Sequence, residues 1–367
     1  MLGWTSAPGE GMHRAVSQHQ TLFRGLGLTG ALSAIVVLGA AVSAACGKTQ
    51  SSRGSASEAP PPPTVESSES SPAEIVAPLA RQLVFPDRFS IGTLEMRDRS
   101  PAPGSEEAWE ALGEARGVVL IPTGKVLSLR IAANPELRSA SFLGAFEAED
   151  LERLYVHGDP SLGDDDLARI GRLVHLRVLL LQGLPRVTDD GLRHLRSLTR
   201  MRALTLLGLR ITDEGLAHLA ELPELKSLTI RGGQILGFNL GRLGALPALE
   251  TLNLSGNPVS DAGLADLRGL KSLRVLELEQ TSITDQGLAR LEGLADLEWL
   301  NLQSTAITDA GLERLAALPR LRRLDLRGTQ VTSEGLERLR AAAPQCLILP
   351  GLPSSGSAPD EPLRTDG

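Results

Sequence analysis

The stretch "ITDQGLARL" at residues 283–291 returns as "ITDAGLERL" at 307–315, and a close variant, "ITDEGLAHL", occupies 211–219. Aligning the whole chain on this element reveals strand-like cores of the form LxxLxL. These cores begin at Val126, Leu151, Leu176, Met201, Leu225, Leu249, Leu273, Leu297 and Leu321, with a spacing of 25 residues at first and 24 later. A period this regular indicates a repeat architecture in which every copy is one supersecondary unit.

A single copy, residues 273–296, has two apolar stripes. Leu276 and Leu278 point to one side of a short strand, and Val275, Glu277 and Glu279 point to the other. Thr284 or Asp285 can cap the helix that follows, in which leucines recur every three residues. One coil cannot shield both stripes from water, so the copies must stack on one another.

The pattern LxLxxTxITDxGLxxLxxLxxL resembles the leucine-rich repeat family, in the subtype found in F-box proteins and in many bacterial proteins. The [VI][TS][DS]xGL element is intact in six coils, beginning at Val187, Ile211, Val259, Ile283, Ile307 and Val331. The resemblance covers residues 126–348 and implies an α/β solenoid of about nine coils, with parallel strands on the concave face and short helices on the convex face. Asn257 stands where the family has its Asn ladder, and Thr281, Thr305 and Thr329 replace it in other coils. Their hydroxyls are expected to bond the neighbouring coil.

The coil that begins at Leu225 departs from the pattern. Its "RGGQILGFNLGRL" (231–243) lacks the Thr-Asp pair and carries additional glycines. Neutral drift in a coil held by its neighbours explains this change, and a flexible interruption that opens a binding notch is the alternative.

The regions that flank the repeats have different compositions. In residues 78–125, which we interpret as an N-terminal cap, "RQLVFPDRFSIGTLEMRD" (81–98) predicts one or two strands and "SEEAWEALGEAR" (105–116) predicts a short helix. Residues 46–77 are rich in Ser, Pro and Glu and predict a disordered tether. Residues 349–367 predict a disordered tail, and Cys346 just before them is interpreted as a buried apolar residue.

The N-terminus predicts an export signal over residues 1–45. Residues 25–45 carry no charge and follow Arg14 and Arg24, as in a signal peptide. The segment "VSAACGK" (42–48) resembles a bacterial lipoprotein lipobox, although Ser43 stands where Leu is usual. The resemblance implies lipidation of Cys46 and a protein of the cell envelope, anchored at the outer membrane, the periplasmic face or the cell surface. An uncleaved transmembrane anchor is the alternative, since 21 apolar residues are long enough to span a bilayer.

Nothing in the sequence predicts catalysis. The formal net charge of -7 argues against a nucleic-acid partner. His194 and His218 occupy equivalent positions in adjacent coils but lack further metal ligands. Asp213, Asp261, Asp285 and Asp309 recur where a helix start favours negative charge. No nucleophile stands beside a base, so we expect no enzyme activity, cofactor, metal or small-molecule substrate.

The nine strands offer a continuous outward surface, on which we place a binding site for a protein partner. The candidate residues are Arg153, Tyr155, Leu180, Arg231, Asn253, Glu277, Glu279, Trp299, Asn301, Asp325 and Arg327. Tyr155 and Trp299 are the expected hot spots, because aromatic side chains supply much contact area at a small loss of entropy. The sequence thus predicts a non-catalytic, lipid-anchored binding module; the alternative is an intracellular substrate receptor or effector linked to ubiquitin transfer.

Overall fold

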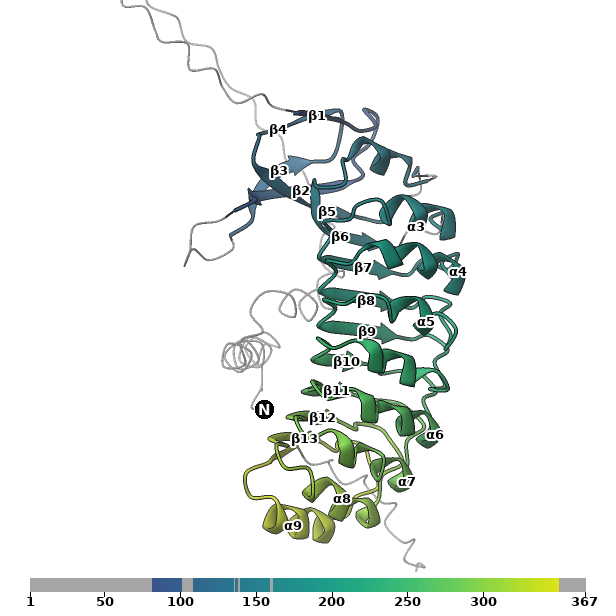
Figure 1. Cartoon of the computed structure of the whole chain (residues 1–367), viewed down its shortest axis with the longest axis vertical. Helices are drawn as coiled ribbons and strands as arrows, with labels where there is room; N and C mark the ends of the chain where they lie inside the picture. The colour runs from purple at the N-terminus through teal and green to yellow at the C-terminus, as the bar shows by residue number, and fades with distance from the viewer. Residues whose placement is uncertain (1–80, 101–107, 135, 138, 159–160, 350–367) are drawn as a thin grey trace, which may run out of the picture. The chain divides into compact units, whose positions relative to one another are not determined.

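Parallel strands dominate the residues that the computed structural model describes, namely 81–100, 108–134, 136–137, 139–158 and 161–349. Each strand pairs with the next one along the chain. In order they are β5 (Lys125–Ile131), β6 (Leu151–His157), β7 (Val178–Gln182), β8 (Ala203–Leu207), β9 (Ser227–Arg231), β10 (Thr251–Asn253), β11 (Val275–Glu277), β12 (Trp299–Asn301), β13 (Arg323–Asp325) and β14 (Leu347–Leu349). Figure 1 shows these strands stacked one after another along one side of the coils, with the short helices along the opposite side. The predicted α/β solenoid is therefore confirmed.

Short helices occupy the second half of each coil. They are η1 (Ser141–Ala145), α3 (Asp164–Ile170), α4 (Asp189–Leu192), η2 (Arg193–Ser197), α5 (Leu216–Leu219), η3 (Leu240–Ala245), α6 (Asp261–Leu264), η4 (Ala265–Gly269), α7 (Asp285–Leu288), η5 (Leu291–Gly293), η6 (Asp309–Gly311), α8 (Leu312–Ala316) and α9 (Ser333–Ala342). Most are single turns, because each coil has only 24 or 25 residues in which to leave the sheet and return.

The core lies between the strands and these helices. Leu276 and Leu278 of one coil, and Leu300 and Leu302 of the next, are fully buried. Their registers match, since Leu276 pairs directly with Leu300. Burying a leucine contributes about 1.5–3 kcal/mol, and every coil repeats the same set of leucines, so stacking alone provides a continuous core.

The N-terminal cap is built from strands alone within the described residues. β1 (Arg81–Val84) and β4 (Val118–Ile121) form a separate antiparallel pair. β2 (Gly92–Asp98) joins the large sheet antiparallel to β5, and β3 (Glu110–Glu114) pairs with β2. β2 therefore covers the edge of the first parallel strand.

The helix predicted over residues 105–116 is wrong, since 110–114 form β3 and 105–107 lie outside the described residues. Its Glu and Ala residues favour a helix locally, but the exposed edge of β2 offers main-chain partners over Glu110–Glu114. Gly113, with φ +126°, adopts a backbone conformation that a helix does not contain. Tertiary pairing therefore overrides local propensity here.

The Thr-Asp pair of the repeat joins neighbouring coils. The amide and hydroxyl of Thr308 donate to the two carboxylate oxygens of Asp285, at 2.9 and 2.6 Å. Thr188, Thr212, Thr284 and Thr332 donate in the same way to Asp164, Asp189, Asp261 and Asp309. We call this series the Asp–Thr ladder. The aspartates therefore hold the next coil, which the helix-start explanation from the sequence did not anticipate.

The glycine of the TDxGL element makes room for this ladder. A Cβ on Gly287 would lie 2.3 Å from Asp261 Oδ1, and one on Gly311 would lie 2.4 Å from Asp285 Oδ1. Each carboxylate reaches the next threonine by crossing directly over the next glycine. The motif therefore repeats because each of its residues serves the adjacent coil.

Polar side chains just after the strands bond in two different ways. Asn257 does donate to the neighbouring coil, at 2.7 Å from Ile230 O. The hydroxyls of Thr281, Thr305 and Thr329 instead donate within their own coils, to the carbonyls of Leu278, Leu302 and Leu326. The expected threonine bonds between coils are wrong, because each hydroxyl bonds the carbonyl three residues earlier in its own coil.

Several predicted segments lie outside the described residues. These are the signal over 1–45 with Cys46, the tether over 46–77 and the tail beyond 349. Leu349 itself belongs to β14, so the solenoid ends one residue later than predicted. Among the residues that the structure describes, every helix is too short or too polar to cross a bilayer.

Candidate binding face

Three parallel rows of side chains run across the outward side of the sheet, which we call the strand face. The central row contains Arg130, Tyr155, Leu180, Thr205, Thr229, Asn253, Glu277, Asn301 and Asp325. The leading row lies two residues earlier in each strand and includes Arg153, Val275, Trp299 and Arg323. The trailing row includes His157, Gln182, Leu207 and Arg231 in the strands, and reaches Glu279 and Arg327 just beyond them. The register thus aligns the candidate residues as the sequence predicted.

The central row is largely covered by its own neighbours. Tyr155 is 5% exposed, Asn253 is 8% exposed and Asp325 is 3% exposed. Adjacent strands lie only about 4.8 Å apart, so side chains in register shield each other. Leu180 and Asn301 are buried too. A partner would therefore first meet the two outer rows, where Arg153, Trp299 and Glu279 are half-buried and Arg231 and Arg327 are exposed.

Three of the polar candidates have a structural role. The side-chain oxygens of Asn253, Asn301 and Asp325 accept the backbone amide two residues later, at 2.9, 2.9 and 3.1 Å. These bonds satisfy an amide where each short strand ends. This explains why an Asn or Asp recurs in the central row, and their part in binding stays a prediction.

Arginine side chains stack on aromatic rings at the N-terminal end of the strand face. The guanidinium of Arg130 lies 4.3 Å from the ring centre of Tyr155, and that of Arg153 lies 4.5 Å from the ring centre of Trp109. Arg97 lies 5.2 Å from the same Trp109 ring and pairs with Glu152 at 2.5 Å. Such contacts fix the arginine planes in place.

Trp109 is the residue that the sequence reasoning missed. It precedes β3 directly, and it reaches Arg153 only because β3 adds to the edge of β2. The same residues were interpreted as a helix, so its place beside the strand face was not foreseen. Strand alternation in "WEALGEA" is too weak a signal to reveal it.

Paired charges fill the C-terminal end of the strand face. Arg231 lies 3.5 Å from Glu279, and Arg327 binds Asp325 through two nitrogens. Asp325 raises the pKa of Arg327. Arginines thus offset the negative charge at this end of the strand face. A further arginine, Arg323, stacks 4.7 Å from the ring centre of Trp299.

Glu277, in the central row of the strand face, has a shifted pKa. Burial raises its pKa, the nearby charge of Glu279 raises it further, and Arg231 and Arg323 oppose the rise. Asn253 Nδ2 donates to its Oε2 at 2.8 Å. The pKa of Asp309 in the Asp–Thr ladder moves in the opposite direction, because the Thr332 hydroxyl and amide donate to its carboxylate.

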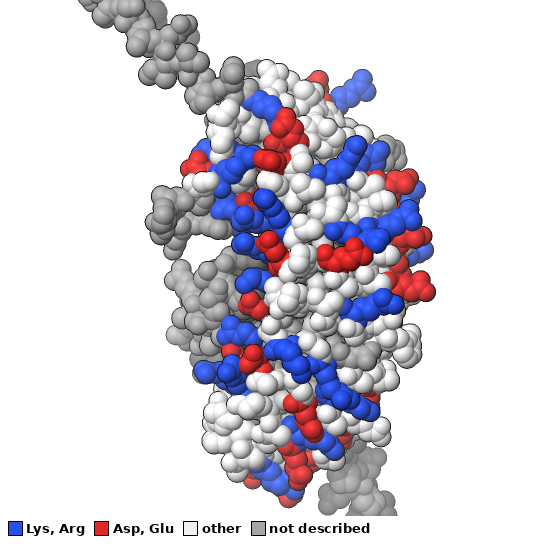
Figure 2. Space-filling model, in the orientation of Figure 1, with Lys and Arg blue, Asp and Glu red and all other residues white. Residues whose placement is uncertain are grey.

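The charged side chains in the view of Figure 2 are interspersed rather than separated by sign. Many are joined across coils, as are Arg274 with Glu298 at 2.7 Å and Lys226 with Glu250 at 2.9 Å. An interspersed surface of this kind favours specific contacts with a protein over general attraction to a polyanion.

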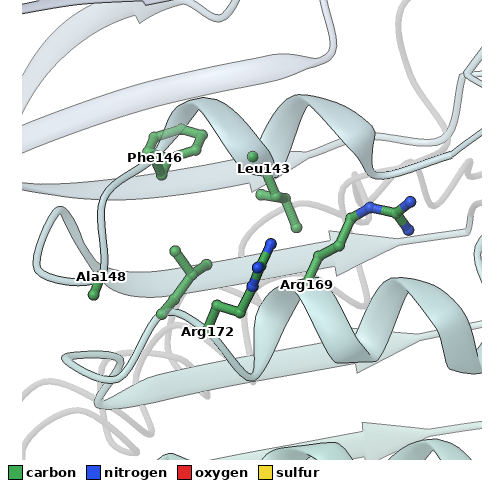
Figure 3. Close-up of a pocket in the computed structure, with 7 residues that line it drawn as sticks. Leu143, Phe146, Ala148, Arg169 and Arg172 are labelled. Atoms are coloured by element: carbon green, nitrogen blue, oxygen red, sulfur yellow. The ribbon is translucent and has the colours of Figure 1, made fainter.

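Two hollows lie on the helix side of the described residues. One, of about 230 Å3, is lined by Leu143, Phe146, Ala148, Arg169, Arg172 and Leu173. Figure 3 labels five of these residues, with the two arginines beside Leu143. The other, of about 420 Å3, lies between α8 and α9. In the described part of the chain no three His, Cys, Asp or Glu side chains gather in a way that could hold a metal ion.

Comparisons with known proteins agree with this geometry. A family model described as "Leucine Rich repeat" matches residues 246–267, 295–316 and 318–339. The coils that the structure describes form a leucine-rich repeat solenoid, and such domains are typically protein-interaction modules. No curated protein matches the chain by sequence.

Three solved structures illustrate the similarity of fold. An internalin (inlF) from Listeria monocytogenes is 19% identical with a TM-score of 0.35, over 54% of this chain and 73% of that one. Internalin C2 from the same species is 25% identical with a TM-score of 0.40, over 51% and 73%. A plant peptide hormone receptor, RGFR1 in complex with RGF2, is 17% identical with a TM-score of 0.38, over 57% of this chain and 33% of that one.

Proposed function

We propose that this protein is an exported, lipid-anchored and non-catalytic binding module that holds a protein partner on its concave strand face. The observation that carries the proposal is the strand face itself. It is a continuous surface, about 40 Å long for nine strands at this spacing, with fixed arginine and aromatic side chains in its outer rows.

The anchoring half of the proposal rests on the sequence around Cys46. A cysteine that follows an uncharged apolar segment and precedes a Ser, Pro and Glu-rich stretch fits an acylated N-terminus joined to a tether. A tether of this composition would let the solenoid turn relative to the membrane and reach a partner.

The binding half is tested best in the outer rows, because changes there do not disturb the core. We would compare partner capture by wild type with that by Arg231→Glu together with Arg327→Glu, and by Trp299→Ala. The matched control is Arg320→Glu, which reverses a charge at a side chain that is 64% exposed and pairs with Asp296. Capture lost in the first two variants and kept in the control supports the strand face; equal capture by all would move the site to the helix side or the cap.

The anchoring half has its own test. Metabolic labelling with a clickable palmitate, with the mature mass recorded, compares wild type with Cys46→Ala. Label that depends on Cys46, with cleavage just before it, supports an envelope protein. An uncut and unlabelled chain would favour a transmembrane scaffold or the intracellular receptor linked to ubiquitin transfer.

A further inference from the structure

β1 and β4 form a two-stranded antiparallel sheet although β2 and β3 separate them in the sequence, and we call this pair the β1–β4 hairpin. Its outward face is apolar except for Gln82. Val84 is 61% exposed, Val118 is 59% exposed and Leu120 is 55% exposed. Val84 lies directly opposite Val118, and Leu120 lies opposite Gln82, so the four side chains share one face. No charged residue belongs to this face.

The other face of the hairpin already supplies the core. Leu83 and Ile121 are buried against the cap. An antiparallel pair with one buried face normally presents polar residues to water on the other. Three of the seven exposed large apolar side chains found among the described residues gather on this hairpin instead, and such a gathering calls for a contact.

The position of the hairpin in the chain indicates what that contact is. β1 begins at Arg81, where residues 1–80 join the described part of the chain. Cys46 therefore lies 81 − 46 = 35 positions before the hairpin. The sequence predicts a disordered tether here, and a flexible chain of that length would span on average about 30 Å. The hairpin would then have a local concentration near the anchor in the millimolar range.

We propose that the outward face of the β1–β4 hairpin rests on the surface of the lipid bilayer that holds Cys46. The inference relies on the anchoring half of the proposed function and adds a second contact to it. The three side chains expose on the order of 250 Å2, far less than the roughly 800 Å2 per partner of a stable protein interface. A weak apolar contact is sufficient beside a lipid anchor, because the anchor already confines the hairpin to the surface.

This contact would orient the solenoid. Held at its N-terminal end by the hairpin, the stack of coils would extend away from the bilayer with its strand face open to a partner. The exposed side chains at other sites, Phe238 in the coil after β9 and Leu347 in β14, would then remain in water.

The first experiment places an environment-sensitive fluorophore on the hairpin. Full-length acylated protein carrying Val118→Cys and Cys346→Ser is labelled, since an acylated Cys46 does not react, and is reconstituted in vesicles of bacterial phospholipid. Matched controls carry the label at Phe238→Cys or Leu347→Cys, which are 66% and 56% exposed. We expect a blue shift, and quenching by spin-labelled lipid, for the hairpin label alone. The same emission from all three labels, or a blue shift without vesicles that grows with protein concentration, would overturn the proposal.

A second experiment separates the hairpin from the anchor. Cys46→Ser protein with an N-terminal polyhistidine tag is held on vesicles that contain a nickel-chelating lipid, and the same label is read. Without that lipid, the triple variant Val84→Gln, Val118→Gln and Leu120→Gln should partition into vesicles about tenfold less than its parent. If the label reports lipid here but Cys46 is not acylated in the wild type, the anchor is rejected and the hairpin contact stands. If Cys46 is acylated but the label reports no lipid, the hairpin contact is rejected and the anchor stands.

Discussion

The coil that begins at Leu273 and the coil that begins at Leu225 bury equivalent leucines, but they differ in the helical segment on the outer side. Leu276 and Leu291 in the first, and Leu228 and Leu243 in the second, are fully buried. The first coil continues into α7, whereas the second has only the 3-10 turn η3. Leucine register is therefore sufficient for stacking, and the TDxGL element decides the geometry of the outer side.

The Asp–Thr ladder changes character at the second coil. Asp213 accepts the backbone amides of Leu236 and Gly237, at 2.9 and 2.8 Å, in place of a threonine. Gly237 has no carboxylate to offer the next coil, so the Ser260 amide bonds Leu236 O at 3.1 Å instead. Backbone groups thus replace the missing Thr-Asp pair at this junction, and Leu236 and Phe238 are exposed there.

The largest effect should come from filling the space under the ladder. Gly287→Ala places a Cβ 2.3 Å from Asp261 Oδ1 and 3.1 Å from Ile283 Cγ2, which should lower the free energy of unfolding by about 3 kcal/mol. The matched control is Gly244→Ala in the coil that begins at Leu225, which we call the irregular coil. The nearest atom to the added Cβ there would be 3.5 Å away. Chemical denaturation measures both; equal losses would show that the ladder is not the constraint.

Removing one rung should have the next largest effect. Asp285→Ala deletes both bonds from Thr308 and leaves its amide without that acceptor, for a loss of about 2 kcal/mol in the free energy of unfolding. Asp285→Asn keeps one acceptor oxygen and should lose less. Unchanged denaturation midpoints for both variants would show that the Asp–Thr ladder forms because the coils stack and does not itself stabilise the fold.

Restoring the motif in the irregular coil should not repair it. Leu236→Thr with Gly237→Asp recreates the Thr-Asp pair, yet Gly237 has φ +105° and its Cβ would lie 2.6 Å from Gly263 Cα. The strain should lower the free energy of unfolding by about 1–2 kcal/mol. A thermal melt that shows a higher Tm for the double variant would mean that the backbone returns to the regular form and that the Thr-Asp pair alone determines it.

A smaller, pH-dependent effect is expected at Glu277 in the regular coil. Its folded pKa is raised above the ordinary value of 4.5, so its favourable contribution is complete below that pH and is lost as the pH rises through the folded pKa. Glu277→Gln should therefore raise Tm at neutral pH and change it little below pH 4.5. A difference in Tm that stays constant with pH would contradict this origin.

The smallest effect concerns the last coil. Burial raises the pKa of the half-buried Cys346 thiol to about 11, so little thiolate exists at neutral pH. Labelling by iodoacetamide in folded protein should be much slower than in denaturant, with Cys346→Ser as the blank. Equal rates would show that the last coil opens readily, unlike the coils inside the stack.

Local periodicity explains why the sequence was a good guide to the solenoid and a poor one to its cap. The repeats carry the same signal nine times, so a weak preference at each copy becomes a strong one in sum. Residues 110–114 occur once, favour a helix by composition and become β3 only because β2 has an open edge. The same holds for the candidate site. Its rows could be predicted from the register, but the burial of Tyr155 and Asn253 and the contact of Trp109 with Arg153 could not.

The sequence by itself determined the length of a coil, the face on which each leucine lies and the order of side chains along the strand face, because all three depend on spacing within one repeat. Only the tertiary structure decided which side chains stay accessible, which charges are paired and why the aspartate and glycine of TDxGL must occur together. Those properties arise from contacts between residues about 24 positions apart, and such contacts exist only once the coils have stacked.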